Sequence, residues 1–209
     1  TITSQVSANV DAGFSIVKFT SNASTLTAGH GLNSIPDLII VKATSFADSW
    51  FVNSSALTNQ TDRALRLNAT SAEETNSAFW NNVAPTSTTF SLGNGISING
   101  NSYIAYCFKS ISGYSKVGSY VGTGATGNAQ YLGFEPAFLL VKRTSSTSDW
   151  YMIDNKRNPS NPRNSWLNAN TYTAEYTPSH GVDFLSNGFS FISTDLNGTG
   201  QSWIFLAIA

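Results

Sequence analysis

The chain has 209 residues, of which 41% are hydrophobic, 12% aromatic and 11% charged, and its formal net charge is −1. This length suffices for one large domain or two smaller ones, and the apolar content is too high for a disordered chain. The lack of a basic excess argues against nucleic-acid binding, and no apolar run reaches the ~18 residues that membrane insertion requires. Ser, Thr and Asn supply most of the polarity, which is typical of a neutral β-rich surface.

Similar residues recur along the chain at an interval of 100 positions. Pro36 returns as Pro136 and Trp50 as Trp150. A fixed internal period indicates one structural unit that is used twice. The expected organisation is a lead-in arm at 1–12, a first repeat at 13–110 and a second repeat at 113–209. The join between the repeats is too short for a flexible linker, so the repeats are expected to pack closely.

The local patterns within both repeats are those of short strands separated by Gly, Asn and Ser turns. Strands are expected at 14–19, 37–42, 50–53, 88–92 and 103–108, and at 137–142, 150–153, 188–192 and 203–208. The continuous apolar runs 37–42 and 137–142 are typical of strands that are buried on both faces. Residues 72–80 predict a short helix. The predicted fold class is all-β, with two tandem, closely packed β-sandwich repeats of the jelly-roll type.

Several motifs together resemble a family of bacteriophage proteins. They lie at 13–17, 29–32, 36–42, 103–108, 113–120, 154–159 and 183–189. The chain resembles a domain of unknown function that occurs in tail-fibre and other virion structural proteins of marine phages.

The resemblance implies a non-enzymatic virion module of a tail fibre or similar appendage. Such a module would bind a host cell-surface glycan or receptor, contact other virion proteins, and be assembled in the bacterial host cytoplasm. Appendages of this kind are usually symmetric homo-oligomers, commonly trimers. One alternative is a purely structural virion protein without a ligand, either capsid-associated or appendage-building. Another is a polysaccharide depolymerase.

The residues suited to catalysis or metal binding are few and scattered. His30 and His180 precede glycines and are expected to be solvated loop residues, whereas Cys107 lies in an apolar run and is expected to be buried. A metal site needs three or four converging ligands, and a serine hydrolase of the α/β type needs a Gly-x-Ser-x-Gly turn that this sequence lacks. We therefore expect no enzymatic activity, no catalytic residue, no metal and no cofactor.

Two acids flank the turns before the recurring tryptophans. Asp48 and Asp149 are expected to cap turns or to pair with Lys42 and Lys142. Trp50 and its counterpart at 150 are expected to be core residues, because fold-determining side chains recur with the repeat.

Five side chains are candidates for ligand binding. The segment 154–164 gathers Lys156, Arg157 and Arg163 among Asn and Pro, and a polar loop on a rigid β scaffold is a common place for recognition. Trp80 and Trp166 have no counterparts at the interval of 100, so they are expected to be exposed contacts. The alternative for the loop is that its own side chains tie it down.

Overall fold

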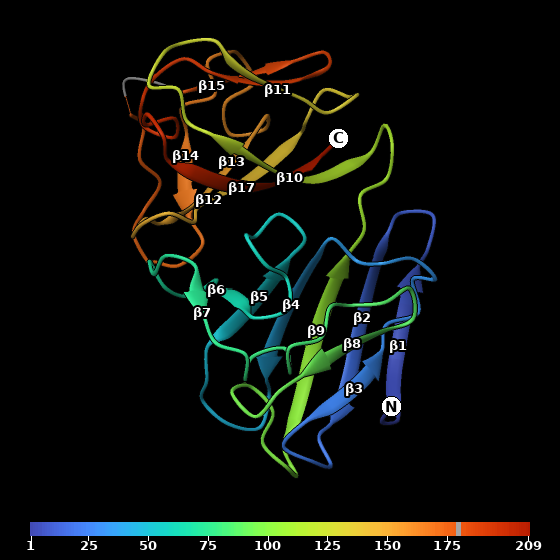
Figure 1. Ribbon diagram of the computed structural model, residues 1–209. Coiled ribbons are helices and arrows are strands. Elements are labelled where there is room, and N and C mark those ends of the chain that lie inside the picture. The colour runs from blue at the N-terminus through green and yellow to red at the C-terminus, as the bar shows by residue number, and fades with distance from the viewer. Residues whose placement is uncertain (179–180) are drawn as a thin grey trace. The chain divides into compact units, whose positions relative to one another are not determined.

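The computed structural model describes residues 1–178 and 181–209, and in this part of the chain all regular structure is β (Figure 1). The chain divides into two compact units. Unit 1 comprises Thr1–Leu67 and Glu73–Ile111, and unit 2 comprises Asn68–Ala72 and Ser112–Ala209. The expected lead-in arm is thus part of unit 1, and a short segment from the first half of the sequence is part of unit 2.

Unit 1 contains a large antiparallel sheet and a small one. The strands are β1 (Ser4–Asn9), β2 (Phe14–Thr20), β3 (Leu26–Gly29), β4 (Leu38–Ala43), β5 (Trp50–Ser54), β6 (Arg63–Arg66), β7 (Glu74–Thr75), β8 (Thr89–Leu92) and β9 (Ser102–Phe108). The large sheet has the order β1-β2-β9-β4-β5-β6-β7, and the small sheet pairs β3 with β8. Figure 1 shows β3 and β8 crossing one face of the large sheet, which gives the unit two layers.

Unit 2 has the same two-layer design. Its strands are β10 (Ser115–Val121), β11 (Asn128–Tyr131), β12 (Phe138–Arg143), β13 (Trp150–Asp154), β14 (Trp166–Asn168), β15 (Val182–Leu185), β16 (Gly188–Phe191) and β17 (Ser202–Ile208). The larger sheet has the order β10-β17-β12-β13-β14, and the smaller has the order β11-β16-β15. The order of the larger sheet matches the order β2-β9-β4-β5-β6 of unit 1.

The pairing register shows where an exact interval of 100 fails. Phe14 lies opposite Phe108 in unit 1, but the residue opposite Ile208 in unit 2 is Ser115, one position later than the interval predicts. The central strands β4, β5 and β9 keep the interval. The residue pairs that β4 forms with β5 and β9 recur 100 positions later in the pairs that β12 forms with β13 and β17. Strand β10 is therefore shifted by one residue relative to β2, while the centre of each sheet is not.

Each unit has its own apolar core between its two sheets. In unit 1, Val17, Val41 and Phe90 are buried in one cluster to which both sheets contribute. In unit 2, Val141 and Phe189 belong to the corresponding cluster. Strands β4 and β12 are buried on both faces over most of their length, as their continuous apolar sequences predict.

The structure differs from two predictions about local structure. The helix expected at 72–80 is wrong, because this segment holds the two-residue strand β7 followed by turns. The expected lead-in arm forms β1, which pairs with β2 over six residues. Trp150 is buried as expected, whereas Trp50 is only half-buried and stacks on Tyr106 with ring centroids 6.4 Å apart.

Candidate functional site

The loop at 154–164 begins with a network that holds Arg157. The guanidinium Nε of Arg157 donates to Asp154 Oδ2 at 2.6 Å, and its NH1 group donates to Glu175 Oε2 at 2.9 Å. A third bond runs from NH2 to the carbonyl oxygen of Met152 at 3.0 Å. Each of the three guanidinium nitrogens donates one of these bonds, so Arg157 is bonded within unit 2 rather than presented to a ligand.

The end of the same loop is fixed by Asn161 and Arg163. The Asn161 side chain donates to the carbonyl oxygen of Phe184 at 2.7 Å and accepts from its N–H at 2.9 Å, as a neighbouring strand would. Arg163 is buried, its NH1 group donates to the carbonyl oxygen of Asn158, and its guanidinium lies 5.5 Å from the centre of the Phe184 ring. The expectation that Arg163 is available to a ligand is wrong for this reason.

Lys156 is the exposed cation of this loop. Its backbone N–H donates to Asp154 Oδ1 at 2.9 Å, while its side chain extends into solvent. The alternative of a loop that its own side chains tie down therefore accounts for Arg157 and Arg163. Lys156 alone stays a candidate contact residue.

The two tryptophans that were expected to be exposed are buried, with 2% exposure each. The indole N–H of Trp80 donates to the carbonyl oxygen of Arg63 at 2.7 Å, and that of Trp166 donates to the carbonyl oxygen of Arg163 at 3.1 Å. The two acceptors stand 100 positions apart, although the tryptophans do not. Both side chains therefore stabilise the fold, and they bond to equivalent carbonyl oxygens although they stand at non-equivalent positions of the sequence. Because both are buried, neither can stack on a ligand.

His30 is also a structural residue. It is fully buried, its Nδ1 accepts from the Leu32 N–H at 3.2 Å, and its Nε2 donates to the Thr86 carbonyl oxygen at 3.2 Å. Burial lowers the pKa of His30, in keeping with a neutral ring. The expectation of a solvated loop residue is wrong here, and the same expectation for His180 lies outside the described residues. Cys107 is buried as expected, and burial raises the pKa of its thiol to about 12.

A buried lysine lies near the end of β12, the central strand of the larger sheet of unit 2. Lys142 is fully buried, and its Nζ donates to the carbonyl oxygens of Ser148 at 2.8 Å and Thr70 at 3.1 Å. Burial, together with the nearby Arg143, lowers the pKa of Lys142 to about 8. In unit 1 the corresponding Lys42 donates to the carbonyl oxygen of Asp48 at 2.9 Å. These lysines brace turns through main-chain carbonyls, in place of the expected carboxylate pairs.

The outer face of the small sheet in unit 2 presents an exposed aromatic ring. Tyr131, Gly188 and Leu185 lie directly opposite one another across β11, β16 and β15, so their side chains share one face. Tyr131 is 72% exposed and Leu185 is 39% exposed, whereas Gly188 between them is buried against the backbone of Gln130. Two residues further along the strands, the same face carries Asp183, whose carboxylate has no bonding partner in the described parts of the chain. We call this surface the Tyr131 face.

The Tyr131 face lies on rigid backbone. The Tyr131 carbonyl oxygen accepts from Lys116 Nζ at 2.7 Å, and Phe189 and Phe184 on the reverse side of the sheet are buried in the core. An aromatic ring on a fixed strand can stack on a sugar ring, and a carboxylate on the same face, two strands away, can accept bonds from sugar hydroxyls. The sequence did not point to Tyr131, because its neighbours form no strand pattern.

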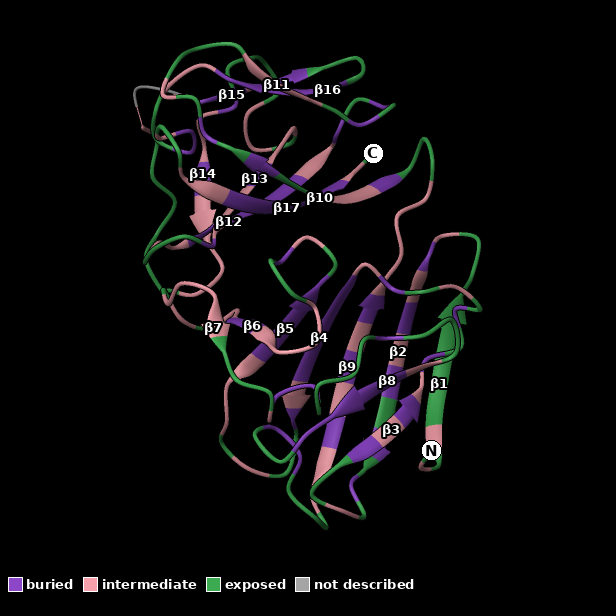
Figure 2. Cartoon of the chain, in the orientation of Figure 1, coloured by how far each residue is buried: buried purple, intermediate pink, exposed green. Residues whose placement is uncertain are grey.

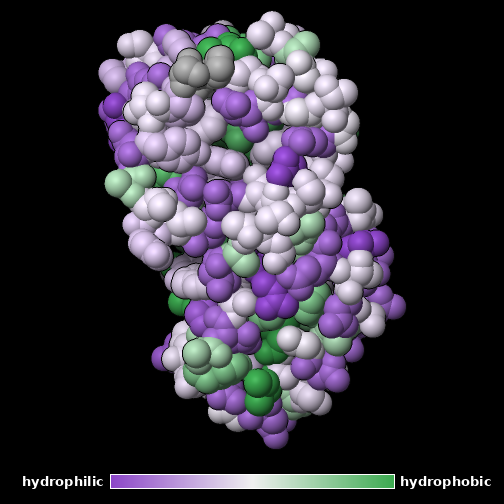
Figure 3. Space-filling view, turned by 90° about the vertical axis from the view of Figure 1, so that its left-hand side faces the viewer, coloured by the Kyte–Doolittle hydropathy of each residue, from purple (hydrophilic) through white to green (hydrophobic). Residues whose placement is uncertain are grey.

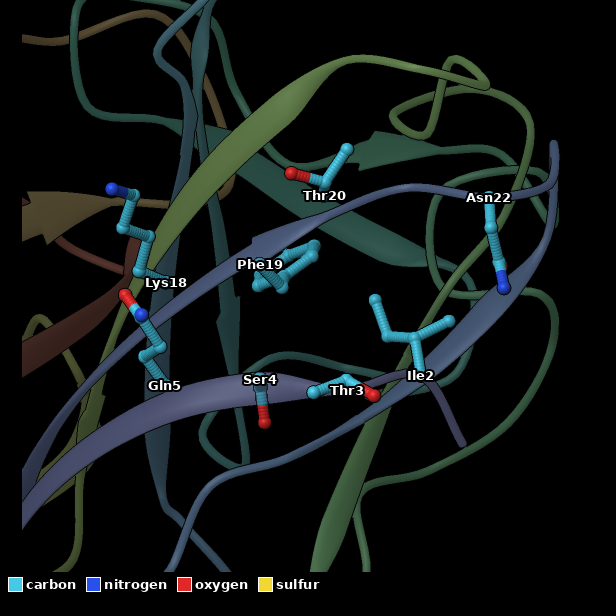
Figure 4. A pocket seen from close by; sticks show the side chains of 8 residues that line it. All are labelled: Ile2, Thr3, Ser4, Gln5, Lys18, Phe19, Thr20 and Asn22. Carbon is cyan, nitrogen blue, oxygen red and sulfur yellow. The ribbon is translucent and has the colours of Figure 1, made fainter.

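A pocket of about 450 Å³ lies in unit 1 along β1 and β2 (Figure 4). Gln5 lies opposite Lys18 on the neighbouring strand, and alternation places Thr3 and Thr20 on the same face. These four side chains are exposed, and Lys18 is the charged residue of the lining. The pocket therefore offers hydroxyl, amide and ammonium groups to a polar molecule.

On the side shown in Figure 3, the surface is mainly hydrophilic or neutral, with small separate hydrophobic areas. Within residues 1–178 and 181–209, no group of three or more His, Cys, Asp and Glu side chains is placed to hold a metal ion. In the same part of the chain, no helix has the length and apolar character needed to cross a membrane.

Comparisons with known proteins return one family. A family described as a domain of unknown function, DUF7483, matches residues 1–209. No curated protein and no solved structure matches the chain.

Proposed function

This chain belongs to the DUF7483 family, and we propose that it is a non-enzymatic module of a bacteriophage tail fibre or similar appendage that binds a glycan on the host surface. The phage assignment is supported by the motifs that resemble virion proteins and by the neutral surface rich in Ser, Thr and Asn. In this proposal the module resides in the virion and is assembled in the host cytoplasm, where it contacts other virion proteins.

The observation that carries glycan binding is the Tyr131 face. Its tyrosine ring is 72% exposed on a strand whose reverse side is core, so the ring is held in place and open to a stacking partner. The Asp183 carboxylate on the same face supplies an acceptor for sugar hydroxyls. Aromatic stacking combined with a fixed polar acceptor provides orientation as well as affinity.

We further infer that the two units derive from one duplicated unit. The shared order of the five central strands supports this, as does the recurring bond from a buried tryptophan to the carbonyl of Arg63 or Arg163. A duplicated scaffold suits a protein that presents surfaces, since one unit can carry a contact that the other lacks. In unit 1 the position corresponding to Tyr131 is the end of β3, where the residue is Gly29.

The test is binding to an array of purified bacterial lipopolysaccharides and capsular polysaccharides. We expect the wild-type chain to bind a subset of them, and Tyr131→Ala to weaken that binding by about tenfold or more. Tyr172→Ala is the matched control, because Tyr172 is fully exposed but lies in a loop away from any strand. Equal binding by the two variants would exclude the Tyr131 face, and release of sugar fragments would show a depolymerase instead.

A second candidate is a purely structural virion protein without a ligand. It is favoured by the loop at 154–164, whose arginines are bonded within unit 2 and stiffen the fold. The absence of binding to every polysaccharide on the array, by a chain whose melting transition shows that it is folded, would support this candidate over the first.

A further inference from the structure

Strand β1 ends the large sheet of unit 1 and is exposed along its length (Figures 1 and 2). It pairs with β2 on one side through six consecutive residues, Ser4–Asn9. Over Ser4–Asn9, its other side borders no strand of the sheet among the described residues, although Ile2, just before it, forms a bridge with Ala28 of β3. A strand in this position carries a row of backbone N–H and C=O groups that are available for pairing with another strand.

The sequence of β1 lacks the usual protection of an edge strand. Natural edges are kept from pairing by charged residues, prolines, bulges or short length. The strand Ser4–Asn9 has the sequence SQVSAN, without a charge or a proline, and its register with β2 is uninterrupted. It also exposes apolar surface, since Val6 and the following Val10 are 42% and 45% exposed.

The other edges of the described sheets are short or charged. The edge strands β3, β7, β8, β11, β14 and β15 have between two and four residues. Strand β10 has seven, but it contains Lys116, whose ammonium crosses to the Tyr131 carbonyl, and Gly118, over which the Phe205 ring packs. Strand β1 is thus the long edge without such protection.

The residue pattern of β1 is complementary to itself. In an antiparallel pair related by a two-fold axis at Val6, Val6 lies opposite Val6 of the second copy, Ser4 opposite Ala8, and Gln5 opposite Ser7. Residues directly opposite share a face, so small and apolar residues meet on one face and polar residues on the other. No like charges face each other, and the exposed Val6 side chains cover one another. A two-fold contact in which each copy uses the same surface is the commonest form of association.

We infer that β1 pairs antiparallel with β1 of a second copy of this chain, joining two large sheets into one continuous sheet. This contact is separate from glycan binding, because the Tyr131 face lies in unit 2 and uses no residue of β1. It is a two-fold contact, and differs in that respect from the trimer that the resemblance to phage appendages implies.

The first experiment is sedimentation velocity on residues 1–209. We expect a concentration-dependent dimer, and Val6→Lys should raise its dissociation constant by about tenfold or more, since it sets two ammonium groups opposite each other. Val121→Lys is the matched control, because Val121 is 59% exposed at the end of the other long edge strand, and it should dimerise like the wild type. The inference is overturned if the wild-type chain is still monomeric at a concentration about 100-fold above the lowest that the assay detects. It is also overturned if the Val6→Lys chain still dimerises.

A second variant covers the case in which Val6→Lys fails to fold. Opposite residues of an antiparallel pair have Cα atoms about 4.5–5.5 Å apart, within the range that a disulfide spans. Val6→Cys should therefore form a covalent dimer under mild oxidation, whereas Val121→Cys should not. The native Cys107 is buried and does not compete. Equal cross-linking of the two variants, or none in Val6→Cys, contradicts the pairing.

Discussion

The buried ammonium of Lys142 makes the stability of this protein depend on pH in a direction that can be measured. Its pKa is lowered to about 8 in the folded chain by burial and by Arg143, against an ordinary value of 10.5. Below pH 8 the folded and unfolded chains both carry the proton. Between pH 8 and 10.5 the unfolded chain holds more of it, so this residue makes the folded state more stable as pH rises.

The size of the effect follows from the difference between the two pKa values. Each pKa unit corresponds to 1.36 kcal/mol, so Lys142 should add about 3 kcal/mol to the free energy of unfolding between pH 7 and pH 10.5. Lys142→Met removes the titrating group and keeps the apolar stem. Other groups also titrate in this range, Cys107 among them, but they are common to both chains.

The assay is urea unfolding of the wild type and Lys142→Met at pH 7, 8, 9, 10 and 10.5. We expect the wild-type free energy of unfolding to gain on that of the variant steadily above pH 8, and the difference between them to be constant below it. Parallel curves across the whole range would refute the reasoning, because they would mean that Lys142 keeps its ordinary pKa in the folded chain.

Two further predictions concern residues that the sequence singles out as ligand contacts. Trp80→Phe should lower the free energy of unfolding by about 1–3 kcal/mol, because it leaves the Arg63 carbonyl without its indole partner, and a loss below about 0.5 kcal/mol in urea unfolding would contradict this role. Arg157→Ala should lower the melting temperature, since Arg157 bonds to Asp154 and two further acceptors, whereas Lys156→Ala should leave it unchanged in the same calorimetric scan. Equal melting temperatures for the two variants would show that the Arg157 network adds nothing to stability.

The central strands of both units could be predicted from sequence, because their patterns are local. The apolar runs 37–42 and 137–142 are too short for a helix and too continuous for an exposed strand. By contrast, β11 has the sequence NAQY and β15 has VDFL, and neither has a pattern that separates it from a loop. These strands exist because the large sheet offers them an apolar layer to cover, which is a tertiary cause.

The candidate site was harder to predict, because exposure depends on the whole fold. Trp80 and Trp166 lack counterparts at the interval of 100, a pattern that predicts exposed roles. The structure shows instead that each reaches the same carbonyl from a different point of the chain. Tyr131 lies opposite Gly188 on the outer face of its sheet, and no sequence pattern reports that pairing. The position of His30 between two glycines predicts a solvated loop, yet Gly31 takes a positive φ of 72° beside it and the His30 side chain is buried.

The bond from Lys142 to the Thr70 carbonyl has a practical consequence for dissecting this protein. The sequence period invites a cut at 110–112, with each half expressed alone, but unit 2 also contains Asn68–Ala72. A fragment starting at 113 would lack the Thr70 carbonyl that accepts from Lys142 and from the Ser148 N–H. It would keep a buried ammonium with one of its two acceptors, so deletion or domain-swap designs of the C-terminal half should carry residues 68–72 with it.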